Sequence, residues 1–476
     1  MTLKRPHTIG LLILVAVVIT GSVIVVAGRD PDAVLQTVSL GQYAGPMVLD
    51  ARTDRVFVAM HNDIMGGGGR LAMLDGVTGA VLRTISLPGS STTLSVDGQT
   101  GAVVVGSGDF GATVTGQVMV LDGQTGAIRR TITLTGYVDG VSVDERTGRL
   151  FTTSAGFASC SSAACAAGKS TMTIIDEETG QVLRSINLSE PSSHVAVDPS
   201  REHLVVASSS YYYGVAPARR STITIVDEHD GRTVHTLSLG GVVSDAPLID
   251  GSSGHAFLLL ATWPAGASAT SLPTISRLLV LDTASGRLLH NISLGSAFSH
   301  MFLDERTRRL IITTIIPART MTPFPTSIGV TTLVPGDVGA LEVFDVRTAT
   351  LVHRVPFRAI PVAVAIDART ARIYVANAGP LGPIGQFMAA GMVSILDERT
   401  YAPLTTATVG ANPIAIRVDE RTGRVFVLNN GSLGVSITPP DPWSWLPGGV
   451  RRLLPFLEPP RPHIVPASIS VLDASR

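Results

Sequence analysis

The sequence has little lysine, little charge and few aromatic residues, and each shortage narrows the possible function. Of the 36 basic residues only Lys4 and Lys169 are lysines, so Schiff-base chemistry has almost no candidate amine. Charged residues make up 15% and the formal net charge is -1, which argues against a protein that holds a polyanion by bulk electrostatics. Aromatic residues make up 5%, so a cluster of them stands out.

Familiar catalytic motifs are absent as well. The sequence has no Ser-His-Asp spacing, no H-E-x-x-H zinc motif, no phosphate-binding glycine loop and no paired catalytic carboxylates. We therefore expect no organic cofactor, and an enzyme is the less favoured class of protein.

One unit repeats along the chain. It is clearest between Ile416 and Asn430, where an apolar strand ends at Asp419, a D-x-x-T-G turn follows and a return strand begins. The first-turn aspartates of the units are Asp50, Asp97, Asp144, Asp198, Asp250, Asp304, Asp367 and Asp419. The second-turn aspartates are Asp75, Asp122, Asp176, Asp227, Asp282, Asp345, Asp397 and Asp473.

Each unit offers four short strands, and a sheet of that size cannot bury both faces alone, so the units should stack radially. Residues 34–41 have the sequence of a fourth strand with no unit before it, while the last unit stops after its third strand. The sequence thus predicts an all-β, eight-bladed β-propeller over residues 33–476, closed by the N-terminal strand. A seven-bladed ring with one displaced unit is the alternative. The blade units begin near residues 46, 93, 140, 194, 246, 300, 363 and 415.

The segments Arg372–Asn377 (RIYVAN) and Arg424–Asn429 (RVFVLN), with the recurring V-L-D-x-x-T-G, resemble the YVTN-type β-propeller repeat of bacterial and archaeal exported proteins. The resemblance covers about residues 33–476 and implies a propeller fold. It implies little about function, because proteins with this repeat include surface and adhesion proteins, periplasmic nucleic-acid binders and distant relatives of redox enzymes.

The repeated aspartates are best explained as structural residues. An aspartate at the start of a tight hairpin accepts a hydrogen bond from the backbone two residues on, and glycine supplies the positive φ that closes the turn. We therefore do not treat these aspartates as calcium ligands or general acids.

The N-terminus carries an uncharged apolar run from Ile9 to Ala27, preceded by Lys4, Arg5 and His7. About nineteen residues at ~1.5 Å each span the hydrocarbon core of a membrane. The basic flank predicts a cytoplasmic N-terminus, so residues 1–28 form a single-pass anchor with the propeller outside the cytoplasm. Cleavage of a signal peptide near Ala27, giving a secreted protein, is the alternative.

The connections between the second and third strands vary most in length, so we expect a ligand on the face that carries them. One of these connections holds Tyr211, Tyr212 and Tyr213, followed by Arg219 and Arg220, which suit sugar or base stacking. Packing of that loop onto its neighbours explains the same residues.

The last and longest connection holds Trp443 and Trp445 between proline-rich arms. We expect it to pack across its own channel mouth as a lid. Contact with lipid headgroups or with a partner is the alternative.

His194 and His300 each lie four residues before a first-turn aspartate, on the connections between blades, which places both at the mouth of the central channel. Two imidazoles facing one axis can bind a metal ion, although the two histidines lie two blades apart. A metal ion is therefore the weaker expectation. Cys160 and Cys165, the only cysteines, predict a local disulfide if the propeller is exported.

The favoured function is a non-catalytic, extracytoplasmic, monomeric binding propeller that presents its variable loops to a protein, a glycan or a surface polymer. The first alternative is an enzyme at the channel mouth, such as a metal-assisted hydrolase or a lactonase-like activity. The second is a single-stranded nucleic-acid binder, which rests on the resemblance and on the Tyr/Arg loop.

Overall fold

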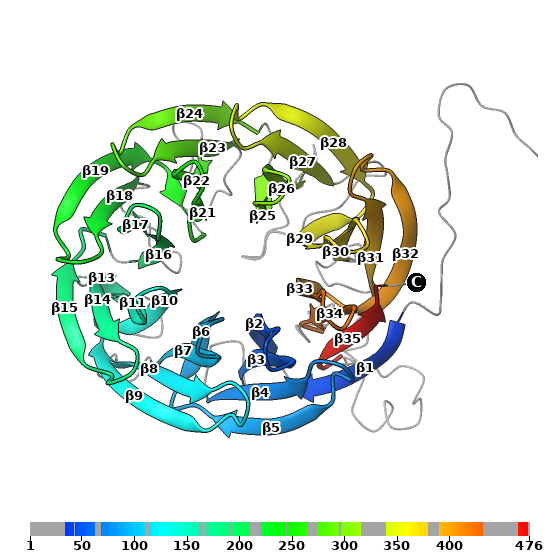
Figure 1. Ribbon diagram of the computed structural model, residues 1–476, viewed down its shortest axis with the longest axis horizontal. Coiled ribbons are helices and arrows are strands. Elements are labelled where there is room, and N and C mark those ends of the chain that lie inside the picture. The colour runs from blue at the N-terminus through cyan, green and yellow to red at the C-terminus, as the bar shows by residue number, and fades with distance from the viewer. Residues whose placement is uncertain are drawn as a thin grey trace, which may run out of the picture.

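The computed structural model describes residues 34–41, 43–61, 68–109, 115–155, 157–160, 165–167, 170–190, 192–209, 220–243, 245–263, 275–294, 297–315, 339–378, 390–431 and 465–474. These residues form a ring of eight antiparallel sheets, the blades of a β-propeller (Figure 1). The predicted fold and the predicted number of blades are confirmed.

The blades follow one another along the chain. Blade 1 contains β2 (Tyr43–Asp50), β3 (Arg55–His61), β4 (Gly69–Asp75) and β5 (Val81–Ser86), and blade 2 contains β6 (Ser90–Val96), β7 (Ala102–Asp109), β8 (Thr115–Asp122) and β9 (Ile128–Thr135). Blade 3 contains β10 (Tyr137–Asp144), β11 (Arg149–Ala155), β14 (Thr171–Asp176) and β15 (Val182–Asn187), with a separate hairpin of β12 (Phe157–Cys160) and β13 (Cys165–Ala167). Blade 4 contains β16 (Ser192–Asp198), β17 (His203–Ser209), β18 (Arg220–Asp227) and β19 (Thr233–Gly240).

The second half of the ring repeats the pattern. Blade 5 contains β20 (Val242–Val243), β21 (Leu248–Asp250), β22 (His255–Thr262), β23 (Ile275–Asp282) and β24 (Leu288–Ser293). Blade 6 contains β25 (Ala297–Asp304), β26 (Arg309–Ile315), β27 (Gly339–Asp345) and β28 (Leu351–Phe357), and blade 7 contains β29 (Ile360–Asp367), β30 (Arg372–Ala378), β31 (Ala390–Asp397) and β32 (Pro403–Ala411). Blade 8 contains β33 (Pro413–Asp419), β34 (Arg424–Asn429), β35 (Ala467–Asp473) and β1 (Val34–Gly41).

The ring closes within blade 8, where the two ends of the propeller meet. β1 pairs antiparallel with β35, and Figure 1 shows the blue first strand beside the red last one. The hydroxyls of Thr37 and Ser470 lie 3.1 Å apart across this pair. Closure removes the open sheet edge that the last blade would otherwise expose.

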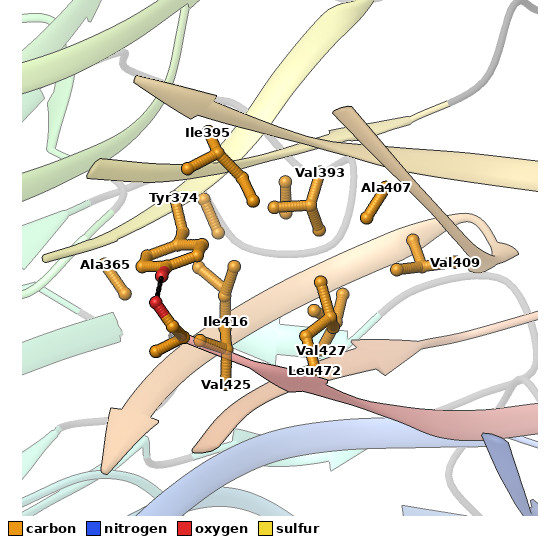
Figure 2. Packing of buried hydrophobic residues seen from close by; sticks show 13 residues of the cluster. Ala365, Tyr374, Val393, Ile395, Ala407, Val409, Ile416, Val425, Val427 and Leu472 are labelled. Carbon is orange, nitrogen blue, oxygen red and sulfur yellow. Dashed lines mark hydrogen bonds between the residues drawn. The ribbon is translucent and has the colours of Figure 1, made fainter. Parts of the chain in front are cut away.

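Burial follows position within the blade. The second strands are buried almost throughout, as in β3, while the outermost strands are largely exposed, as in β5. Apolar side chains of neighbouring blades fill the space between the sheets, and Figure 2 shows this for blades 7 and 8, where Tyr374 and Val393 pack with Val425 and Leu472. Each blade therefore depends on both neighbours for its core.

The aspartate turns form as the sequence predicts. In every first turn an oxygen of the aspartate accepts the backbone N–H two residues on. In the second turns a glycine with positive φ usually closes the loop, as at Gly79 with φ 69°. Ala349 and Tyr401 take the same left-handed conformation at the equivalent position. The aspartates are thus structural, as expected.

Residues 1–33, which include the predicted anchor or signal peptide, lie outside the described residues. Within the described ranges no helix is long and apolar enough to cross a membrane.

Candidate functional site

A cavity of about 540 Å³ lies at the inner strands of blades 5 to 8. It is lined from β21, β25, β29 and β33, the strands nearest the centre of the ring in Figure 1, and we call it the axial cavity. Apolar side chains make up much of the wall, including Leu248, Ile249, Met301 and Phe302. The ionisable residues that line it are Asp245, His300, Glu305 and Arg417.

Arg417 projects from the middle of β33 and is half-buried. Its Nη1 donates a hydrogen bond of 2.8 Å to the backbone carbonyl of the adjacent Ile416. Within the described part of the chain this is its only hydrogen bond, and its guanidinium makes no ion pair. Burial lowers the pKa of Arg417 from its ordinary value, because the protein wall solvates the charge less well than water does.

His300 is half-buried on β25, with its Nδ1 buried and without a hydrogen-bond partner among the described residues. Burial lowers the pKa of His300; the Asp245 carboxylate opposes this shift and the positive charge of Arg417 adds to it. Its imidazole is therefore mostly neutral at neutral pH.

His194 lies on β16, also half-buried, and burial lowers its pKa too while the Asp245 carboxylate again raises it. Asp245 thus acts electrostatically on both predicted histidines. Both lie inside the innermost strands, so the expectation that they sit on the connections between blades is wrong. The inner strands begin earlier than the turn spacing suggested, and only His300 lines the axial cavity.

The predicted metal site gains no third ligand. No group of three or more His, Cys, Asp or Glu side chains in the described residues is arranged to hold a metal ion. The pairing of His194 with His300 at one ion stays a prediction.

Most of the predicted ligand-binding residues lie outside the described residues, namely Tyr211, Tyr212, Tyr213, Arg219, Trp443 and Trp445. Arg220 is described and opens β18. Its Nε donates a hydrogen bond of 2.7 Å to the buried carboxylate of Glu190. The guanidinium is therefore at least partly engaged in a structural ion pair.

The hairpin of β12 and β13 bears on the predicted disulfide. Its register places Cys160 directly opposite Cys165. Opposed positions of an antiparallel pair bring Cα atoms within the range that a disulfide needs. The backbone is compatible with the bridge, and the bond itself stays a prediction.

Sequence reasoning missed Arg417, whereas Asp245 could be noticed in the sequence, because it stands one residue before the position that holds His194 and His300 in other units and so offers a possible His/Asp set. A signal for Arg417 was present, because it stands two residues before a first-turn aspartate. The other seven units carry uncharged residues at that position, namely Val48, Ser95, Ser142, Ala196, Leu248, Phe302 and Ala365. A single charge in an otherwise uncharged ring of inner-strand positions marks a candidate site.

Comparison with solved structures shows what the fold is similar to. A protein described as dihydro-heme d1 dehydrogenase NirN in complex with DHE aligns with a TM-score of 0.52 and 11% identity, over 80% of this chain and 74% of that one. Kuenenia stuttgartiensis hydrazine synthase aligns with a TM-score of 0.45 and 14% identity, over 67% of this chain and 90% of that one. At 11% identity the similarity to the first protein shows the fold alone. With a TM-score of 0.45, the similarity to the second is too weak to support a conclusion.

No family model matches the chain. No curated protein matches it either. The resemblance to the YVTN-type repeat therefore stays a prediction, while the propeller fold is established.

Proposed function

We propose that this protein is a non-catalytic binding propeller that works outside the cytoplasm and takes part of its ligand into the axial cavity. The observation that carries the proposal is the cavity itself, with apolar walls and few ionisable groups. Its volume of about 540 Å³ falls in the range of small-molecule sites, roughly 300–1,000 Å³, which are mostly apolar with a small number of placed polar groups.

The location rests on the N-terminal sequence. The apolar run from Ile9 to Ala27 with its basic flank supports export, either anchored or secreted. The variable connections then face the exterior of the cell and would contact the remainder of a larger ligand, such as a glycan or a protein surface.

A binding role fits the described residues better than catalysis. An activated nucleophile or base is normally oriented by a hydrogen-bonded partner. Within the described ranges the Nδ1 of His300 has no such partner, and one Asp245 oxygen accepts the backbone N–H of Ala246 at 2.8 Å. The cavity holds ionisable groups without the bonded chain that would activate them.

One observation supports an enzyme as the second candidate. A mostly neutral imidazole at His300, influenced by Asp245 and Arg417, has the protonation state of a general base at neutral pH. A channel-mouth hydrolase or lactonase would show ester or lactone turnover that disappears in a His300→Gln variant. Turnover at the background rate in both proteins would remove this candidate.

The binding proposal is tested by filling the cavity. Ala246 lines it and stands four residues before a first-turn aspartate, the position that holds His194 and His300 in other blades. That position therefore accommodates a ring. We expect an Ala246→Phe variant to fold normally and to lose the ligands that a thermal-shift screen of oligosaccharides, peptides and small organic acids finds for the wild type.

The matched control is Ser185→Phe, which adds the same ring on the exposed outermost strand β15 of blade 3. It should keep every ligand of the wild type. Ligands retained by Ala246→Phe with wild-type affinity would contradict the placement in the axial cavity and point to the loops instead.

A further inference from the structure

The unbalanced positive charge of Arg417 is the least expected feature of the axial cavity. Taking a charge out of water costs several kcal/mol unless a counter-charge or hydrogen bonds replace the lost solvation. Elsewhere in the described residues, half-exposed arginines on the turns pair with buried carboxylates, as Arg146 does with Asp144 and Glu228. Arg417 has only the carbonyl of its own neighbour.

The carboxylates of the cavity do not neutralise it. Asp245 and Glu305 line the same space, but neither forms an ion pair with Arg417 among the described residues. One oxygen of Asp245 instead accepts the backbone N–H of Ala246. The carboxylate also raises the pKa of His194 and of His300. Glu305 is exposed at the turn that follows β25. Four of the five N–H donors of the Arg417 guanidinium therefore have no partner in the described residues and are open to water or to a ligand.

A second group in the same cavity is also unsatisfied. The Nδ1 of His300 is buried and has no partner within the described residues. Arg417 and His300 both line this cavity, and the charge of Arg417 also acts on the imidazole. A neutral imidazole donates one hydrogen bond, from whichever ring nitrogen carries its proton. The cavity thus combines one cation and one imidazole with an apolar wall.

We propose that the axial cavity binds an amphipathic acid, whose carboxylate or phosphate group is held by Arg417 and His300 and whose apolar body lies against the wall formed by Leu248, Met301 and Phe302. The planar guanidinium fork matches both kinds of anion in bidentate geometry. The proposal rests on the proposed function, and it adds the chemical class of the ligand and the residue that selects it.

The experiment compares probes that differ only in charge. Binding of 2-naphthoate, 2-naphthyl phosphate and the neutral 2-naphthamide to the purified protein is measured by isothermal titration calorimetry. We expect at least one anion to bind about 10- to 100-fold more tightly than the amide, the value of a charged hydrogen bond in a partly desolvated site. The better of the two anions distinguishes a carboxylate ligand from a phosphate ligand.

Arg417→Gln should abolish the preference for the anion and leave binding of the amide unchanged. The matched control is Arg287→Gln, which removes an exposed arginine from a second turn and should keep the preference. His300→Ala should weaken anion binding several-fold while the anion still binds better than the amide. Without ligand, Arg417→Gln should melt at the same temperature as the wild type or higher, because it removes an uncompensated charge.

Each other outcome overturns the proposal in a distinct way. Equal affinity for amide and anions in the wild type, with binding lost in Ala246→Phe, would reject the anion while the binding function stands. Anion binding that survives Arg417→Gln would reject the assignment to Arg417. An Arg417→Gln protein that melts several degrees lower would show that the arginine supports the wall. No binding of any probe to the wild type would reject the amphipathic acid, and Ala246→Phe would then test the cavity with ligands from the wider screen.

Discussion

The turn face and the axial cavity differ in how their polar side chains are paired. On the turn face, which we define by the eight first turns and the seven second turns between consecutive strands, all eight first-turn aspartates are buried and each accepts a backbone N–H of its own turn. In the axial cavity Arg417 and the Nδ1 of His300 lack such partners within the described residues. Buried oxygens without a partner in the described residues also occur on the turn face, at Asp97 and Asp419, so it is the combination of an unpaired cation with a cavity that indicates a partner from outside.

The turn face also connects the blades. In blade 5 the residue after the second-turn aspartate, Thr283, donates to Asp198, the first-turn aspartate of blade 4. In three other blades the residue at this position is a buried glutamate, namely Glu177, Glu228 and Glu398. Four interfaces between blades thus carry a polar side-chain contact of this kind over an apolar core.

The contact between blades 2 and 3 is an exception on the turn face, because two carboxyl groups meet there without an arginine in the turn. At the contact of blades 2 and 3, Asp97 lies close enough to Glu177 to raise its pKa, and one buried oxygen of each carboxyl, Oε2 of Glu177 and Oδ2 of Asp97, has no hydrogen-bond partner in the described residues. The equivalent pair of Asp144 and Glu228 has Arg146 beside it, whereas Gln99 stands at that position of the Asp97 turn. Burial and the neighbouring aspartate raise the pKa of Glu177 and of Glu228 to about 7, so each pair favours a protonated glutamate, and the Glu177 pair does so without an arginine at that turn position.

The largest expected loss of stability comes from removing a buried carboxylate that accepts several hydrogen bonds. Asp198 is fully buried and accepts from Ser200, both N–H and Oγ, and from Thr283. Asp198→Ala should lower the free energy of unfolding by about 3–5 kcal/mol, since it leaves the turn N–H of Ser200 without its acceptor and removes the buried carboxylate that pairs with Arg201. Urea unfolding followed by circular dichroism measures it.

The control for that prediction is Asp227→Ala, in the second turn of the same blade. Its carboxylate also accepts two backbone N–H groups, at 2.9 and 3.0 Å, but in an exposed setting. The expected loss is about 1 kcal/mol. Equal losses for the two variants would contradict the importance of burial on the turn face.

The next effect depends on pH. Burial, and then the contact with Asp97, raise the pKa of Glu177 to about 7 from its ordinary 4.5, while Thr100 and the positive charge of Arg129 oppose the shift. The folded protein holds this proton more tightly, so its contribution to stability is complete below about pH 4.5 and is lost as the pH rises through about 7. The loss amounts to at most about 3 kcal/mol.

Glu177→Gln isolates that contribution, because an amide donates a hydrogen bond to Asp97 at every pH. The variant should match the wild type at pH 4.5 and exceed it in stability at pH 8.5. Glu178→Gln removes the exposed neighbouring carboxylate and should leave the pH profile unchanged. Parallel profiles of wild type and Glu177→Gln between pH 4.5 and 8.5 would refute the shared proton.

Much of the turn face could be predicted from the sequence, because its chemistry is local. An aspartate, a threonine and a glycine within five residues determine a turn, and their repetition determined the number of blades. The closing strand was also visible, since residues 34–41 match the missing fourth strand. The split of the inner strand of blade 5 into β20 and β21 was missed; Pro247, which cannot donate to the ladder, lies directly before β21.

The axial cavity could be predicted only in part, because its chemistry is not local. The positions of His194 and His300 near the axis follow from the turn spacing, and Asp245 stands one residue before the equivalent position of blade 5, but its electrostatic effect on both histidines becomes apparent only when the blades are placed around one axis. The lack of a counter-ion for Arg417 is likewise a property of four blades together. Sequence patterns report what a segment needs, while a binding site depends on what distant segments leave unsatisfied.

The smallest expected effect concerns a carbonyl group that accepts hydrogen bonds from two donors. Tyr374 is fully buried between blades 7 and 8, and its hydroxyl donates to the carbonyl of Ala474 at 3.2 Å (Figure 2). The same carbonyl also accepts from Arg372 at 2.7 Å. The equivalent position holds phenylalanine in four other blades, at Phe57, Phe151, Phe257 and Phe426.

Tyr374→Phe should therefore cost about 0.5–1.5 kcal/mol in urea unfolding, because the carbonyl keeps one donor and the ring keeps its packing. Arg372→Gln, which leaves the tyrosine hydroxyl as the remaining donor, should cost a similar amount, and the double variant should cost more than the sum because the carbonyl then has neither. Strictly additive losses would mean that the two donors do not substitute for each other. In that case the turn face would owe its stability to individual bonds, and an unsatisfied group such as Arg417 would be a weaker indication of an external partner.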